Sequence, residues 1–328
     1  MKAWKLTRPE GLNYLKLSRA QKPNPANDEV LIHVAAVGLN PMDYKLAAWG
    51  FATWQYPQII GLDIAGTIAT VGKDVTHLKE GDRVVCFADP RTAGGFAYYA
   101  TAKAHTLTRI PDQISFEQAA ALPCAGYSAW LAVHDKLDVQ PGQHIAITGA
   151  GGGVGGFAVQ LARQAGAHVY AIAEQRHRPR LLNYGAEAVI DPSQDNVAMR
   201  ILDLTEAHLL HAVIDCVSAK SGSIMSSLIR YNGEIVMIAD QFDHVPLLAT
   251  TKALSLHEVA LHGTYAHGEP EDIHHLADIG NTLTNLVAEG KLDPMIEQVL
   301  PFDKLAKGLK ILKQQKHSGK LVVSTNQF

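Results

Sequence analysis

The sequence Ile145-Ala146-Ile147-Thr148-Gly149-Ala150-Gly151-Gly152-Gly153-Val154-Gly155-Gly156 decides the fold class of this chain. Its apolar start predicts a buried β-strand, and the apolar residues after the glycines recur at helical spacing until Gly166, which predicts the helix end. Glycines between a strand and a helix let the backbone approach a phosphate, and the free N–H groups of the helix attract its charge. Two registers of a GxGxxG pattern fit the stretch. It predicts dinucleotide binding through Gly151, Gly152, Gly153 and Val154 rather than a mere flexible turn.

Short apolar runs continue to alternate with helical patterns along the second half of the chain. After the strand at 145–147, strands are expected at 169–173, 188–190, 212–216, 233–238 and 259–265. Strands that alternate with helices form right-handed crossovers and a parallel sheet covered on both faces. This half is therefore expected to form a doubly wound α/β domain of the Rossmann type.

The first part of the chain has a different texture. Its apolar runs at 30–34, 83–87 and 96–99 are short, rich in β-branched or aromatic residues and flanked by turn formers, which predicts a mostly β domain. Near the C-terminus, a helical pattern at 273–287 and a second one from Asp303 precede a strand at 321–323. The end of the chain is expected to return to the first domain.

Composition argues against several classes of protein. The 328 residues are 47% hydrophobic and carry a net charge of −3, so the chain can bury two cores and lacks the basic excess typical of nucleic-acid-binding proteins. The three cysteines are far apart, and the N-terminus lacks the apolar core of a secretory signal, which predicts a cytoplasmic protein. The longest uncharged stretch, 118–134, is interrupted by Pro123 and Gly126, so no membrane span is expected.

The loop after the second Rossmann strand bears on the choice between NADH and NADPH. Glu174 lies nineteen residues after Gly155, where a carboxylate accepts hydrogen bonds from the adenosine ribose and favours NAD. Arg176, His177 and Arg178 follow at once, and such a cluster either binds a 2′-phosphate and favours NADP or simply solvates a surface turn. We expect NADPH, with NADH as the alternative.

Further motifs follow in order: Gly38-Leu39-Asn40-Pro41-Met42-Asp43-Tyr44-Lys45, Gly61-Leu62-Asp63, Gly81-Asp82-Arg83-Val84, Gly94-Gly95-Phe96-Ala97, Ala121-Leu122-Pro123-Cys124-Ala125-Gly126 and Gly319-Lys320-Leu321-Val322. Together, over almost the whole chain, they resemble the medium-chain dehydrogenase/reductase superfamily and, within it, the zinc-independent quinone oxidoreductase branch. The resemblance implies a GroES-like, mostly-β domain (1–122 and 266–328) and a Rossmann domain (123–265) with a cofactor in the cleft. It also implies a homodimer joined through the nucleotide-binding sheets.

The resemblance further implies that no zinc is bound. In zinc-dependent relatives a Cys, a His and a third ligand hold the metal, and here Asn40, Leu62 and Ala121 stand at those places. Leucine and alanine cannot coordinate zinc. Without this Lewis acid, hydride delivery to an electron-poor quinone or α,β-unsaturated carbonyl is the expected reaction. Asp63, at the place of the acidic residue beside that His, is expected to keep a structural role.

Two residues of the first motif are the expected catalytic residues. Asn40 is expected to orient the substrate or to donate to a developing oxyanion, and Tyr44 to donate a hydrogen bond and to be a candidate proton source. Alternatively, Asn40 only shapes a turn and Tyr44 only caps the β domain. Further cofactor contacts are expected from strand ends and family motifs, namely Ser128, Cys216, Val217, Ile238, Ala239, Gly263 and Thr264.

Two groups of side chains allow more than one interpretation. The aromatic residues Trp49, Phe51, Trp54 and Tyr56 either line an apolar pocket for a flat ring or pack against the core. The sixteen histidines are expected to be solvated surface residues, because no carboxylate or cysteine pattern completes a metal site with them.

The expected function is therefore that of a zinc-free, NADPH-dependent reductase of quinones or enones. The alternatives are a reductase of enoyl thioesters or other unsaturated acids, and a non-catalytic NADPH-binding protein. The expected partners are a small-molecule substrate and a second copy of the chain, with no nucleic acid and no membrane.

Overall fold

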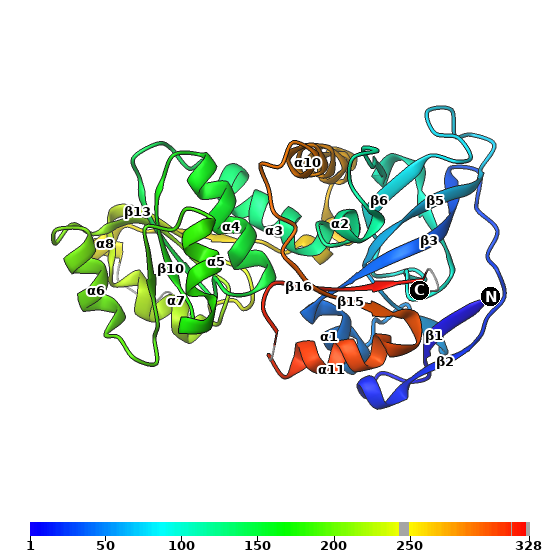
Figure 1. Cartoon of the computed structure of the whole chain (residues 1–328), viewed down its shortest axis with the longest axis horizontal. Coiled ribbons are helices and arrows are strands. Elements are labelled where there is room, and N and C mark those ends of the chain that lie inside the picture. The colour runs from blue at the N-terminus through cyan, green and yellow to red at the C-terminus, as the bar shows by residue number, and fades with distance from the viewer. Residues whose placement is uncertain (243–248, 316, 326–328) are drawn as a thin grey trace. The chain divides into compact units, whose positions relative to one another are not determined.

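The computed structural model describes residues 1–242, 249–315 and 317–325. The backbone forms two compact units (Figure 1): Met1–Tyr127 with Leu261–Phe328, called unit 1, and Ser128–Ala260, called unit 2. The boundaries between the two units lie at 127/128 and 260/261, each five residues from the boundary expected at 122/123 or 265/266. Within the described ranges, no helix combines the length and the apolar character needed to cross a membrane.

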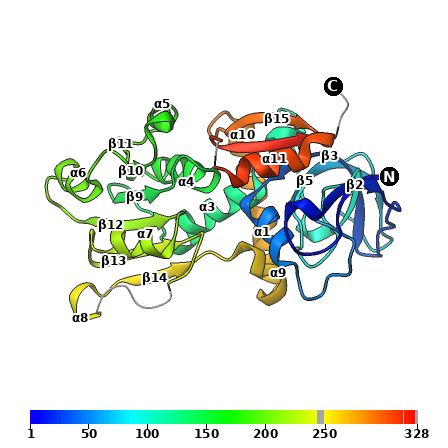
Figure 2. The ribbon, with the colours of Figure 1, turned by 90° about the horizontal axis from the view of Figure 1, so that it is seen from below.

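A six-stranded parallel sheet runs through the described part of unit 2. Its strands lie in the order β11-β10-β9-β12-β13-β14, which can be followed in Figure 2. The chain therefore builds outward from β9 in both directions, and this order confirms the predicted doubly wound sheet. The strands are β9 (His144–Thr148), β10 (His168–Ile172), β11 (Ala188–Ile190), β12 (Leu210–Asp215), β13 (Ile229–Met237) and β14 (Ser255–Glu258).

The helices of unit 2 pack against this sheet because their apolar faces match it. One core cluster joins Tyr170 and Val213 of the sheet to Ile201 of α6 and Met225 of α7. Neighbouring residues of a strand point to opposite faces. Ala146 of β9 belongs to this cluster, so the buried Ile145 and Ile147 lie on the other face of the sheet. The described helices are α3 (Ser128–Trp130), α4 (Gly153–Gln164), α5 (Arg178–Asn183), α6 (Val197–Leu204), α7 (Ala219–Ser226) and α8 (Ala249–Lys252).

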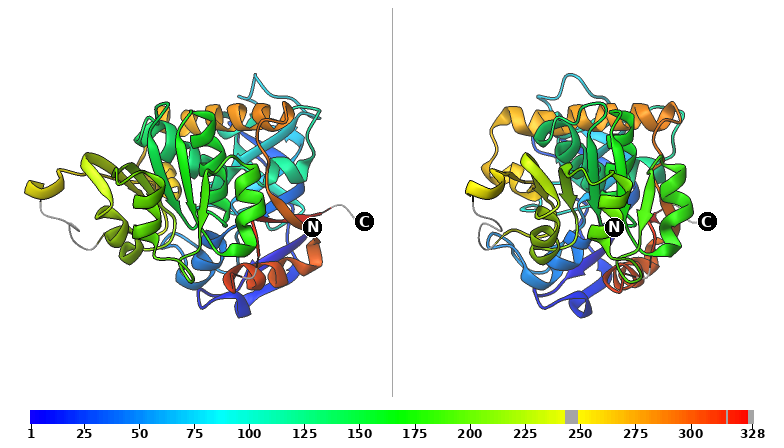
Figure 3. Two further views of the ribbon diagram at one scale, coloured as in Figure 1. Left: turned by 60° about the vertical axis from the view of Figure 1, so that its left-hand side comes forward. Right: turned by 90° about the vertical axis from the view of Figure 1, so that its left-hand side faces the viewer.

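Unit 1 is mostly β and includes the end of the chain. Strand β16 pairs antiparallel with β3, so the red C-terminal elements lie with the blue N-terminal ones in the views of Figure 3. This pairing confirms that the chain end returns to the first domain. One sheet has the order β15-β16-β3-β5-β6-β8, with β7 paired to β3, and a smaller one has the order β2-β1-β4.

The strands of unit 1 are β1 (Lys2–Leu6), β2 (Leu15–Arg19), β3 (Glu29–Leu39), β4 (Gln58–Ile59), β5 (Asp63–Val71), β6 (Arg83–Phe87), β7 (Tyr99–Lys103), β8 (Thr108–Arg109), β15 (Ile296–Pro301) and β16 (Lys320–Ser324). Its helices include α1 (Pro41–Trp49), α2 (Phe116–Ala120), α9 (Thr264–His267), α10 (Pro270–Ala288) and α11 (Leu305–Lys313). The helical patterns expected at 273–287 and near 303 correspond to α10 and α11.

Two predicted strands were wrong in position. The strand expected at 259–265 is absent: β14 ends at Glu258, and a 3₁₀ turn (Leu261–Gly263) and α9 follow. Leu261 and Tyr265 are both buried, and a spacing of four residues places two side chains on one face of a strand and of a helix alike. The strand expected at 96–99 begins only at Tyr99, because the Gly94 and Gly95 backbones turn the chain against residues 59–61.

Candidate functional site

The glycine-rich loop of unit 2 requires glycine at three of its positions. Gly149 has a φ of +63°, in the left-handed region that favours glycine. A Cβ on Gly155 would lie 2.5 Å from the Gly149 carbonyl oxygen, and one on Gly151 would collide with the His177 ring. Helix α4 starts directly after this loop, with Gly152 as its N-cap, so its first N–H groups face the loop. These features fit the phosphates of a dinucleotide.

The loop lies where the strand order reverses. From β9 the chain continues to β10 on one side of the sheet, and from the neighbouring β12 it continues to β13 on the other. Ligands of doubly wound sheets bind at the carboxyl ends of two such strands. There the Thr148 hydroxyl donates to Asp215 (2.8 Å) and accepts from the Cys216 N–H (3.2 Å). A Cβ on Gly149 would lie 3.2 Å from Val217. The structure therefore brings Cys216 and Val217 together with the glycine loop.

The other expected cofactor residues lie in different places. Ile238 follows β13, and its N–H donates to the Asp215 carbonyl oxygen (2.9 Å); Ala239 comes next in the chain. Ser128 is buried at the start of α3. Gly263 and Thr264, expected in the Rossmann domain, belong to unit 1, since the Tyr265 hydroxyl donates to the Phe87 carbonyl oxygen (2.5 Å).

The charged side chains of the loop after β10 contact neighbouring residues of unit 2. Arg176 forms an ion pair with Glu174 (Nε to Oε2, 3.0 Å), and both side chains are exposed. Arg178 donates from Nη1 to the Val189 carbonyl oxygen (3.1 Å). His177 is buried and packs on Gly151 of the glycine loop.

Sequence reasoning missed the arginine that touches the glycine loop. Arg180, three residues after His177, donates from Nη2 to the Gly151 carbonyl oxygen (2.8 Å). Its Nε is buried and has no hydrogen-bond partner. Residues three apart on a helix share a face, so the helical spacing of His177 and Arg180 was the signal that would have found it.

In unit 1, Asn40 lies inside a polar network at the start of α1. Its backbone N–H donates to Asp43 Oδ2 (2.8 Å), as in a helix N-cap. Its amide nitrogen donates to Asp63 Oδ2 (2.8 Å), and its amide oxygen accepts from Lys320 Nζ (2.5 Å). With 1% of its surface exposed, Asn40 is held by three elements and joins α1 to β5 and β16.

The charges of this network are buried almost completely. Lys320 Nζ lies 3.5 Å from Asp63 Oδ2, and Asp63 Oδ1 accepts from the Cys124 N–H (2.9 Å). Burial raises the pKa of Asp63, and the positive charge of Lys320 opposes that shift. Burial also raises the pKa of Asp43 to about 8, and the negative charge of Asp63 adds to the increase. Asp63 thus has the structural setting that the sequence predicted.

Tyr44 is more accessible than Asn40. It follows Asp43 on α1 and is half-buried. Burial raises the pKa of its phenol, so the hydroxyl keeps its proton at neutral pH and remains a donor. Of the two expected catalytic residues, Tyr44 therefore presents the more accessible donor.

Two of the three positions at which no zinc ligand is expected carry buried apolar side chains. Leu62 is 2% exposed and Ala121 is fully buried. In the part of the chain that the structure describes, no group of three or more His, Cys, Asp or Glu side chains converges so as to hold a metal ion.

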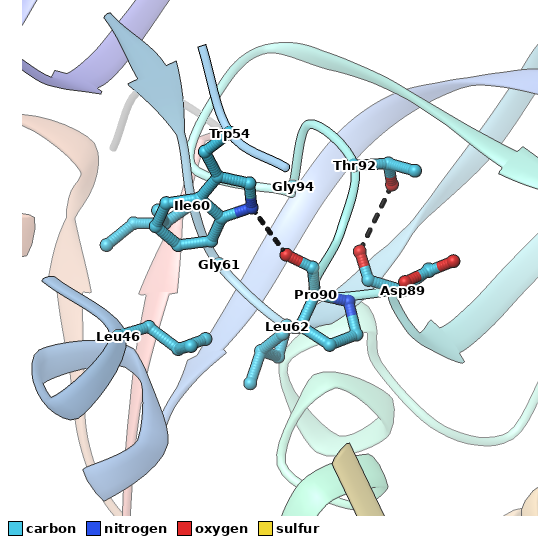
Figure 4. A pocket seen from close by; sticks show the side chains of 9 residues that line it. All are labelled: Leu46, Trp54, Ile60, Gly61, Leu62, Asp89, Pro90, Thr92 and Gly94. Atoms are coloured by element: carbon cyan, nitrogen blue, oxygen red, sulfur yellow. Dashed lines mark hydrogen bonds between the residues drawn. The ribbon is translucent and has the colours of Figure 1, made fainter. Parts of the chain in front are cut away.

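A small cavity in unit 1 lies beside Leu62 (Figure 4). Trp54 forms one wall, with its indole N–H donating to the Pro90 carbonyl oxygen (2.8 Å). The space open to the centre of a water molecule is about 10 Å³, enough for about one water. The lining residues are Leu46, Trp54, Ile60, Gly61, Leu62, Asp89, Pro90, Thr92 and Gly94.

The predicted aromatic group therefore divides between core and surface. Trp54 is 8% exposed and packs into the unit, whereas Trp49 is 66% exposed and lies near the Lys45 ammonium group. Tyr56 and Phe51 flank Trp54 at ring distances of 6.4 and 6.1 Å. Core packing describes Trp54 better than a pocket for a flat ring does, because the adjoining cavity holds only about one water.

Comparisons with known proteins cover both units. Residues 26–112 match the family described as "Alcohol dehydrogenase GroES-like domain" and residues 153–281 the family described as "Zinc-binding dehydrogenase". The chain is 30% identical to a chloroplast envelope quinone oxidoreductase homolog of Arabidopsis thaliana, over 86% of this chain and 85% of that protein. It is 34% identical to the trans-enoyl reductase tazE of Aspergillus terreus, over 61% and 74%. The solved quinone oxidoreductase of Coxiella burnetii superposes with a TM-score of 0.84 at 27% identity, covering 99% of both chains.

Proposed function

The chain belongs to the medium-chain dehydrogenase/reductase superfamily, in its quinone-oxidoreductase-like branch, and we propose that it reduces quinones or α,β-unsaturated carbonyl compounds with NADPH. The observation that carries the proposal is the glycine loop at the strand-order reversal of unit 2, where a Cβ on Gly151 or Gly155 would collide with neighbouring atoms. The GroES-like and Rossmann parts of the chain are those of an NAD(P)H-dependent oxidoreductase.

Unit 2 provides the groups that would hold the dinucleotide. The N–H groups at the start of α4 and the backbone of Gly151, Gly152, Gly153 and Val154 receive the pyrophosphate. Cys216, Val217, Ile238 and Ala239, at the carboxyl ends of β12 and β13, line the adenosine half, and Glu174 with the basic residues after it lies at the ribose. We also assign Ser128, Gly263 and Thr264 to the cofactor site.

The reaction needs one hydrogen-bond donor at the carbonyl oxygen of the substrate. When bound, the dihydronicotinamide supplies a hydride to the electron-poor carbon of the substrate. The Tyr44 hydroxyl donates a hydrogen bond to the carbonyl oxygen, where negative charge develops, and is the candidate source of the proton. Asn40 acts as an orienting residue, since its amide is held between Asp63 and Lys320 and fixes the start of the helix that carries Tyr44.

We propose that this reaction proceeds without zinc. Leu62 and Ala121 have no donor atom for a metal, and the buried Lys320 ammonium group, rather than a metal, neutralises Asp63. Dialysis of the active protein against a chelator is expected to leave its rate unchanged, and a stoichiometric zinc whose removal abolishes the rate would contradict the proposal.

The first experiment is a paired titration of the purified protein with NADPH and NADH, followed by a simple quinone and a simple enone. Tight NADPH binding with its oxidation in the presence of either acceptor supports the proposal. Binding without oxidation of the cofactor supports the non-catalytic alternative. No binding of either cofactor would overturn the dinucleotide assignment.

A reductase of enoyl thioesters is the second candidate function. The similarity to a fungal trans-enoyl reductase, at 34% identity, favours it. Adding a short enoyl thioester to the same assay separates the two functions. A kcat/KM at least tenfold higher for the thioester than for the quinone and the enone would favour this second function.

We also propose a homodimer joined through the Rossmann sheets. In the described part of unit 2, β14 pairs with β13 and has its other edge unpaired. Leu256 on β14 is 41% exposed and Tyr231 on β13 is 63% exposed. An open edge with exposed apolar side chains pairs readily with a second copy. Light scattering is expected to show a dimer for the wild type and a monomer for Leu256→Lys.

A further inference from the structure

Arg180 differs from the other arginines near the proposed adenosine end in what its guanidinium group contacts. One of its N–H groups donates to the Gly151 carbonyl oxygen, within the glycine loop. Arg176 instead has its guanidinium group against the Glu174 carboxylate, and Arg178 donates to the backbone of β11. Among the three, Arg180 is the one that reaches the loop where phosphates are expected.

The guanidinium group of Arg180 can donate more hydrogen bonds than it forms. It carries five N–H groups, and its buried Nε donates to no acceptor. Among the described residues, no carboxylate forms an ion pair with it. A buried N–H without an acceptor costs free energy, and a cation with open donors is the natural partner of an anionic oxygen.

The setting of Arg180 selects the kind of anion. Gly151, Gly152 and Gly153 carry no side chain, so a ligand can approach the loop backbone beside Arg180 closely. A phosphate oxygen matches both features, because it accepts the planar guanidinium fork and the backbone N–H groups of the loop. We propose that Arg180 binds a phosphate group of the dinucleotide and is a specificity-determining residue of the cofactor site. This inference rests on the proposed binding of NADPH.

Two phosphates of the cofactor fit this chemistry, and fragments distinguish them. The adenosine 2′-phosphate is present in NADPH and 2′,5′-ADP, whereas the pyrophosphate is present in NADPH, NADH and ADP. Calorimetric titration of the full chain with all four compounds therefore shows, from their Kd values and without any turnover, which phosphate Arg180 contacts.

The variants are Arg180→Ala, Arg180→Gln and Arg180→Lys, with Arg200→Ala as the control, because Arg200 is an exposed arginine of α6 that pairs with Asp203. Arg180→Gln keeps a donor for the Gly151 carbonyl oxygen but removes the charge, so it separates phosphate binding from support of the loop. Hydrogen bonds between charged groups predict a roughly 10- to 100-fold increase in Kd for Arg180→Gln and Arg180→Ala. Arg180→Lys is expected to fall in between, and Arg200→Ala to change Kd by less than about threefold.

The pattern across ligands decides the outcome. Weaker NADPH and 2′,5′-ADP with unchanged NADH and ADP assigns Arg180 to the 2′-phosphate, and equal weakening of all four assigns it to the pyrophosphate. A folded Arg180→Gln protein that binds all four like the wild type overturns the inference and leaves Arg180 a support of the loop. If the wild type binds none of them, the proposed function itself fails and the inference with it.

Discussion

The ammonium group of Lys320 lies 2.5 Å from the amide oxygen of Asn40, although 280 residues separate them in the chain. This contact joins β16, the last of the described strands, to the N-cap of α1. Asp63 completes the arrangement as the buried counter-ion, 3.5 Å from Lys320. The start of α1, the helix that carries Tyr44, is thus held by the buried ion pair of Lys320 and Asp63 and by the Asn40 amide, which bonds to both.

Removing the cation from this network is expected to destabilise unit 1 strongly. Lys320→Met leaves the Asp63 carboxylate buried without its counter-ion, which costs about 3–5 kcal/mol. Urea unfolding at pH 7 measures the free energy of unfolding. Lys304→Met, which removes an exposed ion pair with Asp303, is the matched control and is expected to cost less than about 1 kcal/mol. Equal losses in the two variants would show that the buried network contributes no special stability.

The buried Asp43 is expected to make the protein less stable as the pH rises. Its pKa is about 8 in the folded chain and near 3.8 when unfolded, so the folded state holds the proton over a range in which the unfolded state has lost it. The contribution is fully present below about pH 4 and is lost progressively up to about pH 8, with a slope of about 1.4 kcal/mol per pH unit. Asp43→Asn removes the titration and keeps an oxygen that accepts the Asn40 N–H.

The measurement is the free energy of unfolding of wild type and Asp43→Asn between pH 5 and 9. We expect the difference between the two proteins to grow in favour of the variant up to about pH 8 and then to level off. A difference that does not change with pH would mean that Asp43 is ionised over the whole range.

The glycine loop gives a prediction with an internal control. Alanine normally stabilises a helix relative to glycine, yet Gly155→Ala places its Cβ 2.5 Å from the Gly149 carbonyl oxygen and is expected to cost about 1–3 kcal/mol. At Gly152 the nearest atom would be 3.4 Å away, so Gly152→Ala is expected to change stability by less than about 1 kcal/mol. Thermal unfolding without ligand compares them, and the expectation fails if Gly155→Ala is the more stable.

Local sequence patterns predicted most of the fold because they are short-range. The apolar runs placed β9, β11 and β12 within one or two residues, and the glycine loop followed from its position between a strand and a helix. The strand expected at 259–265 was wrong because the four-residue spacing of Leu261 and Tyr265 suits either a strand or a helix.

The polar contacts of the site could not be predicted in this way. The roles of Lys320 and Asp63 depend on strands that meet only in the folded sheet, and no local pattern marks a buried ion pair. The cluster at 176–178 drew attention by its charge, whereas Arg180, one helical turn after His177, donates the hydrogen bond to the Gly151 carbonyl oxygen. Composition identifies charged residues but not the direction in which a side chain points.

Tyr44 tests the proposed chemistry. Tyr44→Phe removes the hydroxyl and leaves the ring, so kcat with an enone is expected to fall at least about tenfold, because the donor at the developing oxyanion is lost. The Kd for NADPH, measured by calorimetry, is expected to stay unchanged. Tyr56→Phe, a change of the same kind in unit 1, is the control and should keep kcat within about twofold. An unaltered kcat in Tyr44→Phe would assign the donor to another group.

A ladder of histidines makes unit 2 sensitive to acid. Near the start of three adjacent strands, the rings of His168, His144 and His211 stack with centroids 4.7 and 5.8 Å apart. The backbone N–H of His144 donates to His211 Nδ1 (3.1 Å). Nδ1 accepts a hydrogen bond only when it carries no proton. Burial, aided by neighbouring positive charge, lowers the pKa of His144 and of His211.

Because these pKa values are lower in the folded chain than the unfolded value of about 6.5, their contribution to stability is present above about pH 6.5 and is lost as the pH falls below it. Glu187, which pairs with His168, opposes the effect, whereas Arg230 and His208 add to it. His211→Asn replaces Nδ1 by an oxygen that accepts the same N–H and does not titrate. Hydrogen exchange of the His144 amide is expected to accelerate between pH 6.5 and 5 more in the wild type than in His211→Asn, after correction for the intrinsic rate. Identical pH profiles would show that protonation of His211 does not break this contact.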